Sequence, residues 1–413
     1  MSKIVIISYP FPPQAGVGGR RWAKFCKYFV KRGADFQVLT GPITKPSKSW
    51  MDDTHSYQDK ISIVNNPRGA ALKVIPETIS EKIKYRLALQ RAKRKTKGNY
   101  FDSTVSWTDT LLPEIKKCIE SGADVIIASA GPFSYLQNLL ELKKQFPQVK
   151  LIADFRDPWT NNKTAYGYSD IESNRYQHEK ALEQQVVDQF DAVVSVAQPM
   201  TDYFESLYKG ASMTRFLTIP NGFDAADQSP IELPAAAQHE RVRIGFVGTV
   251  YNKTQRHVKA FADALAKRKE VEFELTFCGE MSNEIRALLI ASNVTCLEPV
   301  SHSEAQKMLS KTDIGLLFLT DDLTYSFSTK FCEYIQNEIP IWAISEDGIT
   351  PSYIQDNGIG HHSKPNAESI MQGFDWWKSN IDSCDYASYS SSDFNVENLS
   401  SMYLNLIDEL RQP

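Results

Sequence analysis

Short runs of apolar, mostly β-branched residues recur along this chain, and stretches with helical periodicity lie between them. The runs are continuous rather than alternating, which is typical of strands that are buried on both faces of a parallel sheet. Regular alternation of such strands with helices predicts a doubly wound α/β fold. In the first half of the chain the runs lie at 4–8, 36–40, 61–64, 125–129, 151–155, 192–196 and 216–219, and helical patterns lie at 20–32 and 170–188.

A polar stretch interrupts this alternation in the middle of the chain. Residues 223–240 contain prolines and show no period, which predicts a linker between domains. A chain of 413 residues is long enough for two or three domains, at roughly 150 residues each. We therefore expect two Rossmann-like domains, at 1–222 and 241–392. A second series of apolar runs follows the linker at 243–247, 274–278, 294–297, 314–319 and 340–344, and an amphipathic helix is expected at about 396–411.

Composition and charge exclude several classes of protein. The net charge is −4, from 46 basic and 50 acidic residues, so bulk charge does not favour a nucleic-acid partner. No apolar run reaches the roughly 18 residues of a transmembrane helix, and prolines interrupt the first apolar run too soon for a signal peptide. The six cysteines are scattered without a CxxC pair, which argues against a zinc site or a disulfide framework. A cytoplasmic protein is the simplest expectation.

A glycine-rich turn follows the first expected strand. Gly16, Gly18 and Gly19 come directly before a helix that begins near Arg20. Backbone N–H groups at such a turn, together with the positive end of the helix dipole, suit a phosphate. Ligands of open α/β sheets bind at the carboxyl ends of the strands, so two facing sheets would form one cleft. The alternative is a flexible turn that lets strand and helix pack.

Polar residues and a tryptophan also follow the strand at 151–155. Asp154, Arg156, Asp157 and Trp159 stand together there. Carboxylates accept hydrogen bonds from sugar hydroxyls, and an arginine binds phosphate or orients a carboxylate. The group therefore suits a polar ligand such as a sugar, with the loop at 160–175 as a flap. The alternative is an Arg–Asp pair that braces a loop.

The second half of the chain offers a candidate diphosphate site. Ser328 or Thr329 is a good N-cap for a helix that begins near Lys330, and the first N–H groups of that helix can hold a diphosphate. Lys330 and Lys253 could neutralise its charge, and Glu333 lies one turn along the helix, within reach of a ribose. The alternative is a capping box, in which Glu333 serves only the helix start.

Taken together, these segments resemble the GT-B glycosyltransferases, and within them the retaining family 4 type of bacterial polysaccharide enzymes. The resemblance covers nearly the full length of the chain. The segments that carry it are IVIISYPFPPQAGVGGRRWAKFCKYFVKRG at 4–33, LIADFRDPWT at 151–160, IPNGFD at 219–224, FVGTVYNK at 246–253 and STKFCEYIQNEIPIWA at 328–343.

The resemblance implies a transferase that uses a nucleotide-sugar donor and needs no cofactor and no bound metal. The donor would lie mainly against the C-terminal domain, with its ribose at Glu333, and a glycan or lipid-linked glycan acceptor would lie against the N-terminal domain. A C-terminal helix, at about 393–413, would return to the N-terminal domain. The implied diphosphate-binding residues are Gly16, Gly18, Gly19, Thr249, Lys253, Ser328, Thr329 and Lys330; the implied catalytic residues are Asp157, Lys330 and Lys253; and the implied sugar or acceptor residues are Arg156, Asp157, Trp159, Phe133 and Tyr325.

The sequence departs from the pattern of this family at three positions. Tyr325 stands where the first of two paired glutamates is usual, Thr249 stands where an arginine is usual, and Phe133 stands where one branch has a histidine. Two other functions therefore stay open beside an active transferase. They are a non-catalytic GT-B scaffold that binds a partner, and a nucleotide-sugar epimerase of the same architecture.

A basic segment lies outside these motifs. Residues 82–97 read KIKYRLALQRAKRKTK, with eight lysines or arginines, no acidic residue and interspersed apolar side chains. Basic amphipathic segments bind anionic membrane surfaces, so a peripheral position on the inner face of the membrane is one expectation. The alternatives are a solvated helix face and a nucleic-acid patch.

Overall fold

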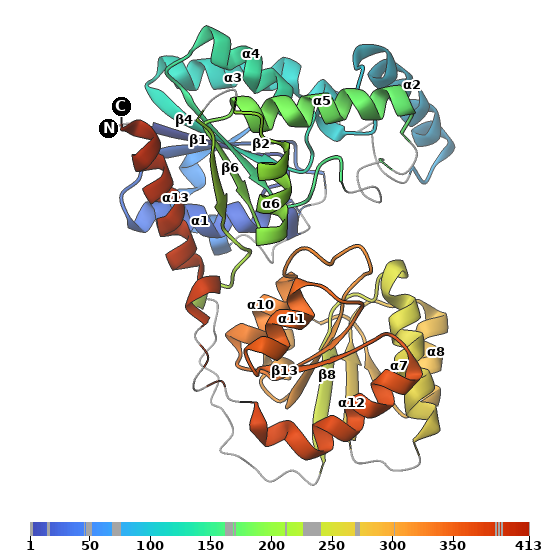
Figure 1. Ribbon diagram of the computed structural model, residues 1–413. Helices are drawn as coiled ribbons and strands as arrows, with labels where there is room; N and C mark the ends of the chain where they lie inside the picture. Colours follow the sequence, from blue (N-terminus) through green and yellow to red (C-terminus); the bar gives the residue numbers. More distant parts are fainter. Residues whose placement is uncertain are drawn as a thin grey trace. The chain divides into compact units, whose positions relative to one another are not determined.

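The computed structural model consists of two compact units, Met1–Pro220 with Glu397–Pro413, and Asn221–Val396 (Figure 1). Gly16, most of the predicted linker at 223–240 and half of the predicted flap at 160–175 lie outside the residues that the structure describes. The described residues are 3–14, 17–44, 46, 52–67, 76–161, 168, 171–210, 213–225, 241–268, 273–300, 302–384, 386, 389 and 391–412.

The first unit is built on a parallel sheet with the strand order β3-β2-β1-β4-β5-β6-β7. Its central strands are buried on both faces, as their continuous apolar runs predict. The chain moves outward from β1 to β3 and then crosses back to β4, so the order reverses between β1 and β4. The strands are β1 (Lys3–Ser8), β2 (Phe36–Thr40), β3 (Ile61–Ile63), β4 (Ala123–Ala130), β5 (Lys150–Phe155), β6 (Ala192–Ser195) and β7 (Arg215–Thr218).

Helices cover both faces of this sheet. Helix α1 lies on one face and α4, α5 and α6 lie on the other, and α13 lies beside α1 (Figure 1). The helices are α1 (Arg20–Lys31), α2 (Ile79–Lys95), α3 (Thr108–Glu120), α4 (Leu136–Gln145), α5 (Ser173–Gln189), α6 (Gln198–Leu207) and α13 (Val396–Arg411), with 3-10 turns η1 (Val17–Gly19), η3 (Asp52–Lys60) and η5 (Ser103–Ser106).

The second unit is built on a parallel sheet with the strand order β10-β9-β8-β11-β12-β13. Its order reverses between β8 and β11, which are direct neighbours. The edge strand β13 was not expected, because its sequence GHHS is not apolar. The strands are β8 (Val242–Val247), β9 (Phe273–Cys278), β10 (Thr295–Leu297), β11 (Ile314–Phe318), β12 (Ile341–Ile344) and β13 (Gly360–Ser363).

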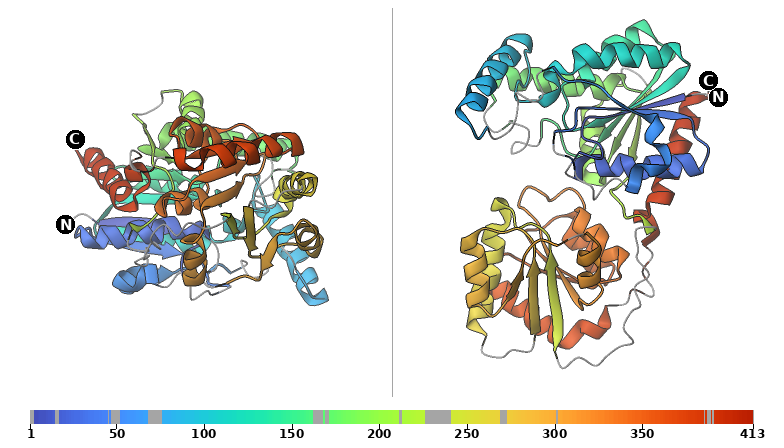
Figure 2. Two further views of the ribbon diagram at one scale, coloured as in Figure 1. Left: turned by 90° about the horizontal axis from the view of Figure 1, so that it is seen from below. Right: turned by 180° about the vertical axis from the view of Figure 1, so that it is seen from behind.

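Two separate apolar cores lie on the two faces of the second sheet. One joins the sheet to α7, α8 and α12, and the other joins it to α10 and α11 (Figure 2). The helices are α7 (Gln255–Lys267), α8 (Asn283–Ala291), α9 (His302–Leu309), α10 (Thr329–Gln336), α11 (Ile349–Asp356) and α12 (Ala367–Asn380), with 3-10 turns η7 (Asn252–Thr254), η8 (Ile381–Ser383) and η9 (Ser391–Phe394). Among the described helices of both units, none combines the length and the apolar character that crossing a membrane requires.

A buried carboxylate joins α1, β5 and α13. Asp154, near the end of β5, accepts hydrogen bonds from the Trp22 indole at 2.7 Å, the Arg21 guanidinium at 3.2 Å and the Tyr403 hydroxyl. All four side chains are almost completely buried. Arg21 also donates to the carbonyl of Pro220 at 2.6 Å. Asp154 is therefore a structural residue, and the sugar-binding interpretation of the motif after β5 does not apply to it.

Helix α5 buries two further carboxylates against the segment that follows β5. Glu179 accepts hydrogen bonds from the Trp159 indole and the Tyr168 hydroxyl, each at 2.8 Å. Glu183 accepts from the backbone N–H of Thr160 at 3.2 Å and from the Thr160 hydroxyl. Burial raises the pKa of both carboxyl groups, and it raises the pKa of Glu183 to about 7.

We expect Asp154→Asn to destabilise the first unit strongly. The substitution leaves the Arg21 charge buried without a counterion and sets an amide N–H against the Trp22 indole N–H, which together cost about 3–5 kcal/mol. Urea unfolding followed by circular dichroism measures the loss. The matched control is Asp124→Asn, which breaks the half-exposed Asp124–Arg411 pair between β4 and α13 and is expected to cost less than about 1 kcal/mol. Equal losses in the two variants would contradict the central role of Asp154.

We expect Glu183 to make the first unit more stable in mild acid than at pH 8. The folded-state pKa of about 7 lies above the ordinary value of 4.5, so its contribution is fully present below pH 4.5 and is lost as the pH rises through 7. A shift of this size corresponds to about 3 kcal/mol. The comparison is the unfolding free energy of Glu183→Gln and wild type across this pH range, with exposed Glu205→Gln as control. The prediction is wrong if Glu183→Gln keeps the full pH dependence of the wild type.

Candidate functional site

The candidate site of the second unit lies where the strand order reverses. There, Gly248 follows β8, and Lys330, from the first turn of α10, extends toward it. The Lys330 ammonium donates a hydrogen bond to the carbonyl of Val247 and lies 5.2 Å from the centre of the Phe246 ring. Gly248 has a φ of +143°, and a Cβ at this position would collide with the Lys330 side chain. Glycine is therefore needed for the backbone turn, and it leaves room for the lysine in this position.

The Lys330 side chain is half-buried, and its amine lies against the backbone and the Phe246 ring. Burial lowers the pKa of Lys330, while the nearby charge of Glu333 raises it to a smaller extent. Within the part of the chain that the structure describes, Lys330 makes no ion pair. An anion next to this amine would replace the hydration that burial removes and stabilise its charged form.

The start of α10 adds backbone donors beside Lys330. Ser328 is the N-cap, as one of the two predicted possibilities, and its hydroxyl accepts from the Phe331 N–H at 3.2 Å. Thr329 is the exposed first residue of the helix. Glu333 stands five positions after the cap, whereas the capping-box partner would stand at Phe331. The capping-box interpretation of Glu333 is therefore wrong, and its half-buried carboxylate lies one turn from Lys330 on the same side of the helix.

The cations expected near the diphosphate have acidic partners. Lys253 lies 2.6 Å from Asp322, and Arg256 binds Asp321 and, at 2.9 Å, Glu346. These pairs hold the loops after β11 and β12 against η7 and α7. Lys253 therefore differs from Lys330, because a phosphate would have to compete with Asp322 for it.

Two of the positions that depart from the family pattern belong to this site region. Thr249 follows Gly248 and is half-buried, and Tyr325 is half-buried on the loop between β11 and α10. Both residues thus lie on the two segments that flank the reversal of strand order.

In the first unit, the predicted arginine serves the backbone. Arg156 donates to the carbonyl of Gly18, after β1, and to the carbonyl of Gly131, after β4. It thereby ties together the two loops at the reversal of this sheet. Gly19 lies so close to the Pro10 carbonyl that a Cβ would collide with it. Arg156 thus braces loops, as the alternative interpretation predicts, but it does so through the carbonyls of Gly18 and Gly131 rather than through a pair with an aspartate. Asp157, the next residue, is half-buried.

The two aromatic residues expected to contact a sugar are core residues. Phe133 and Trp159 have no exposed surface, and their rings stack at 5.3 Å with an interplanar angle of 6°. The Trp159 indole donates to Glu179, and the Phe133 N–H donates to Asp102 at 2.7 Å. The expectation that these rings bind a sugar is wrong for this conformation, because each ring is covered by its own neighbours.

Comparison with solved structures finds matches over the whole chain at low sequence identity. A sucrose-phosphate synthase from Thermosynechococcus elongatus matches with a TM-score of 0.70 at 13% identity, over 99% of each chain. Anabaena HepE, in complex with UDP and glucose, matches with a TM-score of 0.61 at 14% identity, over 99% of this chain and 100% of HepE. A UDP-GlcNAc 2-epimerase from Methanocaldococcus jannaschii matches with a TM-score of 0.56 at 9% identity, over 98% and 99%.

Comparison of the sequence with models of protein families and with curated proteins finds no match. The structural matches nevertheless agree with the two parallel sheets of seven and six strands and their flanking helices. They confirm the fold that the sequence predicts. The chain has the GT-B fold.

Proposed function

We propose that this chain is a glycosyltransferase whose second unit binds a nucleotide-sugar donor. The observation that carries the proposal is the buried Lys330 amine, which lies beside the N-terminus of α10 at the reversal of strand order between β8 and β11. Ligands of open α/β sheets bind at such positions. The solved structures with the same fold support it, because they include a sucrose-phosphate synthase and a protein in complex with UDP and glucose.

In the proposed reaction, the sugar–phosphate bond breaks and negative charge develops on the departing nucleoside diphosphate. Lys330 and the first N–H groups of α10 stabilise this charge, so that the chemistry needs no bound metal. Glu333 accepts hydrogen bonds from the ribose hydroxyls. Lys253 supplies a second cation after it exchanges Asp322 for a phosphate oxygen. The main contributions are thus positioning and electrostatic stabilisation.

The finer parts of the proposal rest on the sequence resemblance. We propose that the sugar is transferred with retention to a growing glycan of a surface polysaccharide. Retention places the acceptor hydroxyl on the face of the sugar from which the diphosphate leaves. Asp157, half-buried after β5, is the carboxylate that we assign to the acceptor side.

The donor site makes a direct prediction for nucleotide binding. We expect one of UDP, GDP, dTDP, ADP or CMP to raise the melting temperature, since a ligand at 100 times its Kd stabilises by about 2.7 kcal/mol. Lys330→Gln should weaken the binding of this nucleotide by about tenfold to a hundredfold, because it removes a charge-assisted contact. Glu333→Ala should weaken the binding to a smaller extent, because it removes the hydrogen bonds to the ribose hydroxyls.

Glu368→Ala, at an exposed position of α12, is the control for both variants and should bind the nucleotide as the wild type does. A nucleotide that stabilises wild type and Lys330→Gln equally would contradict the site. No response to any nucleotide would favour the non-catalytic scaffold. Conversion of the donor sugar without an acceptor would favour the epimerase.

We also propose that α2 docks on an anionic membrane surface. A capping box of Thr78 and Glu81 begins this helix, and Ala88 and Ala92 face the protein. On the opposite side, Ile79, Ile83 and Leu87 recur every fourth residue and are 79%, 55% and 49% exposed. Exposed basic residues flank this stripe on both sides; within the described part of the chain, those without an ion pair are Lys82, Lys84, Arg86, Arg91 and Arg94. An apolar stripe between basic flanks suits the headgroup region of an anionic leaflet.

We expect the variant Lys84→Glu/Arg91→Glu to pellet less with vesicles that contain phosphatidylserine. Each basic residue near an anionic surface contributes about 1 kcal/mol, so the partition coefficient should fall by more than about tenfold. Lys307→Glu/Lys311→Glu, on and after α9, changes the net charge equally and serves as control. The same loss in both variants, or equal binding to neutral vesicles, would remove this proposal.

A further inference from the structure

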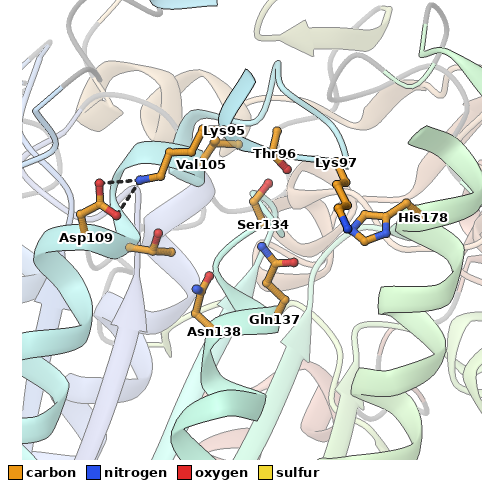
Figure 3. Close-up of a pocket in the computed structure, with 10 residues that line it drawn as sticks. Lys95, Thr96, Lys97, Val105, Asp109, Ser134, Gln137, Asn138 and His178 are labelled. Atoms are coloured by element: carbon orange, nitrogen blue, oxygen red, sulfur yellow. Dashed lines mark hydrogen bonds and ion pairs between the residues drawn. The ribbon is translucent and has the colours of Figure 1, made fainter. Parts of the chain in front are cut away.

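A polar pocket of about 390 Å³ opens in the first unit, and none of the residues assigned above to the donor or the acceptor lines it (Figure 3). It lies between the C-terminal end of α2, the start of α3, the start of α4 and one side of α5. The residues that line it are Lys95, Thr96, Lys97, Val105, Thr108, Asp109, Ser134, Gln137, Asn138 and His178.

One wall of the pocket presents amides and hydroxyls. Gln137 and Asn138 stand in the first turn of α4, and Ser134 comes just before it. Figure 3 shows these three side chains directed into the same space, with Thr96 opposite them. Val105 is the single apolar residue among those lining the pocket. Side chains that both donate and accept hydrogen bonds suit a ligand with several hydroxyl groups.

The opposite wall carries positive charge. Lys95 is neutralised by Asp109, at 2.5 Å, whereas Lys97 is exposed and makes no ion pair within the described residues. In Figure 3 the Lys97 amine lies beside the His178 ring. Burial, and then the charges of Lys97 and Arg175, lower the pKa of His178. The lining therefore carries a net positive charge that an anion would compensate.

The backbone carbonyls at the end of α2 do not oppose an anion. Such carbonyls carry the negative end of the helix dipole. Here Arg175 donates to the carbonyls of Lys93, Thr96 and Gly98, at 2.7 to 3.0 Å. Arg175, which also pairs with Glu172 at 3.2 Å, thus satisfies these carbonyls, and Lys97 is the cation of the lining that makes no ion pair among the described residues.

We propose that this pocket binds a phosphate group that carries a polyol, with the phosphate at Lys97 and His178 and the hydroxyls at Gln137, Asn138 and Ser134. A soluble sugar phosphate and the headgroup of a phospholipid or lipid-linked sugar share this chemistry. The pocket lies at the end of α2, next to the face proposed to meet the membrane. The binding of this ligand does not depend on the proposed function. Only its assignment as the acceptor of the transfer rests on that function.

The test is the titration of His178, followed by NMR in protein with labelled histidines. The sequence has seven histidines, and His178→Asn assigns the signal. We expect glucose 1-phosphate, or soluble short-chain phosphatidylglycerol, to raise the His178 pKa by roughly half a unit or more, because the bound anion favours the protonated ring. Methyl glucoside, which is neutral, should not raise it. The probe that acts at the lower concentration identifies the soluble or the lipid source.

Two variants separate the phosphate contact from the hydroxyl contacts. Lys97→Gln should weaken the binding of the probe that raises the His178 pKa by about tenfold or more. Gln137→Leu should weaken the binding of the same probe, because it removes a contact to the hydroxyls. It should leave the binding of inorganic phosphate, which carries no polyol, unchanged. Lys209→Gln, at an exposed position after α6 and outside the pocket, is the control and should leave the affinity unchanged.

The proposal is overturned if no probe moves the His178 pKa, or if Lys97→Gln and Lys209→Gln bind the probe equally. Lys330→Gln keeps these outcomes distinct from those of the donor site. Lys330→Gln should lose affinity for the nucleotide, while the probe should still raise the His178 pKa. Lys97→Gln should keep its affinity for the nucleotide, while the probe should no longer raise the His178 pKa.

Discussion

The first unit depends on one buried carboxylate. Asp154 receives hydrogen bonds from Arg21 and Trp22 of α1 and from Tyr403 of α13, so that a strand of the sheet and two helices far apart in the sequence share a single charge. A buried charge is tolerated only when it is paired and hydrogen-bonded. The arrangement therefore fixes where α13 packs, and the ring contacts of Tyr403 with Trp22 and Phe25 fill the space around it. The loops that follow β1 and β5 start from this rigid base.

The two sheets reverse their strand order in the same way, but they use the reversal differently. In the first unit, Arg156 donates hydrogen bonds to the carbonyls of Gly18 and Gly131, and these bonds join the two loops. In the second unit, Lys330 touches one carbonyl and a ring, and within the described residues it makes no ion pair. A cation committed to the backbone stabilises a loop, whereas a buried cation with few partners is suited to an incoming anion. The charges thus distinguish the two units more clearly than the fold does.

The sequence predicts most of the fold, because continuous apolar runs report burial on both faces of a parallel sheet. The last helix is confirmed over 396–411, and the N-cap at Ser328 is confirmed as well. β13 escapes prediction because an edge strand with two histidines has no apolar run. Among the candidate site residues, Trp159 and Phe133 were predicted to contact a sugar. That prediction is wrong because side chains next to a polar strand end can still point into the core. Their burial depends on Glu179 of α5 and on Asp102, which are distant in sequence and leave no local signal. The pairing of Lys253 with Asp322 is hidden for the same reason.

The fit of Lys330 against Gly248 constrains how this site can evolve. Any side chain at position 248 would meet the lysine and would also have to adopt a φ of +143°, which L-residues rarely do. Shortening residue 330 removes the collision but leaves the backbone strain. A shorter residue at 330 therefore does not open position 248 to other residues, whereas residue 330 can change while Gly248 is kept. Thr249 and Tyr325, which are also half-buried in this region, carry no such backbone requirement.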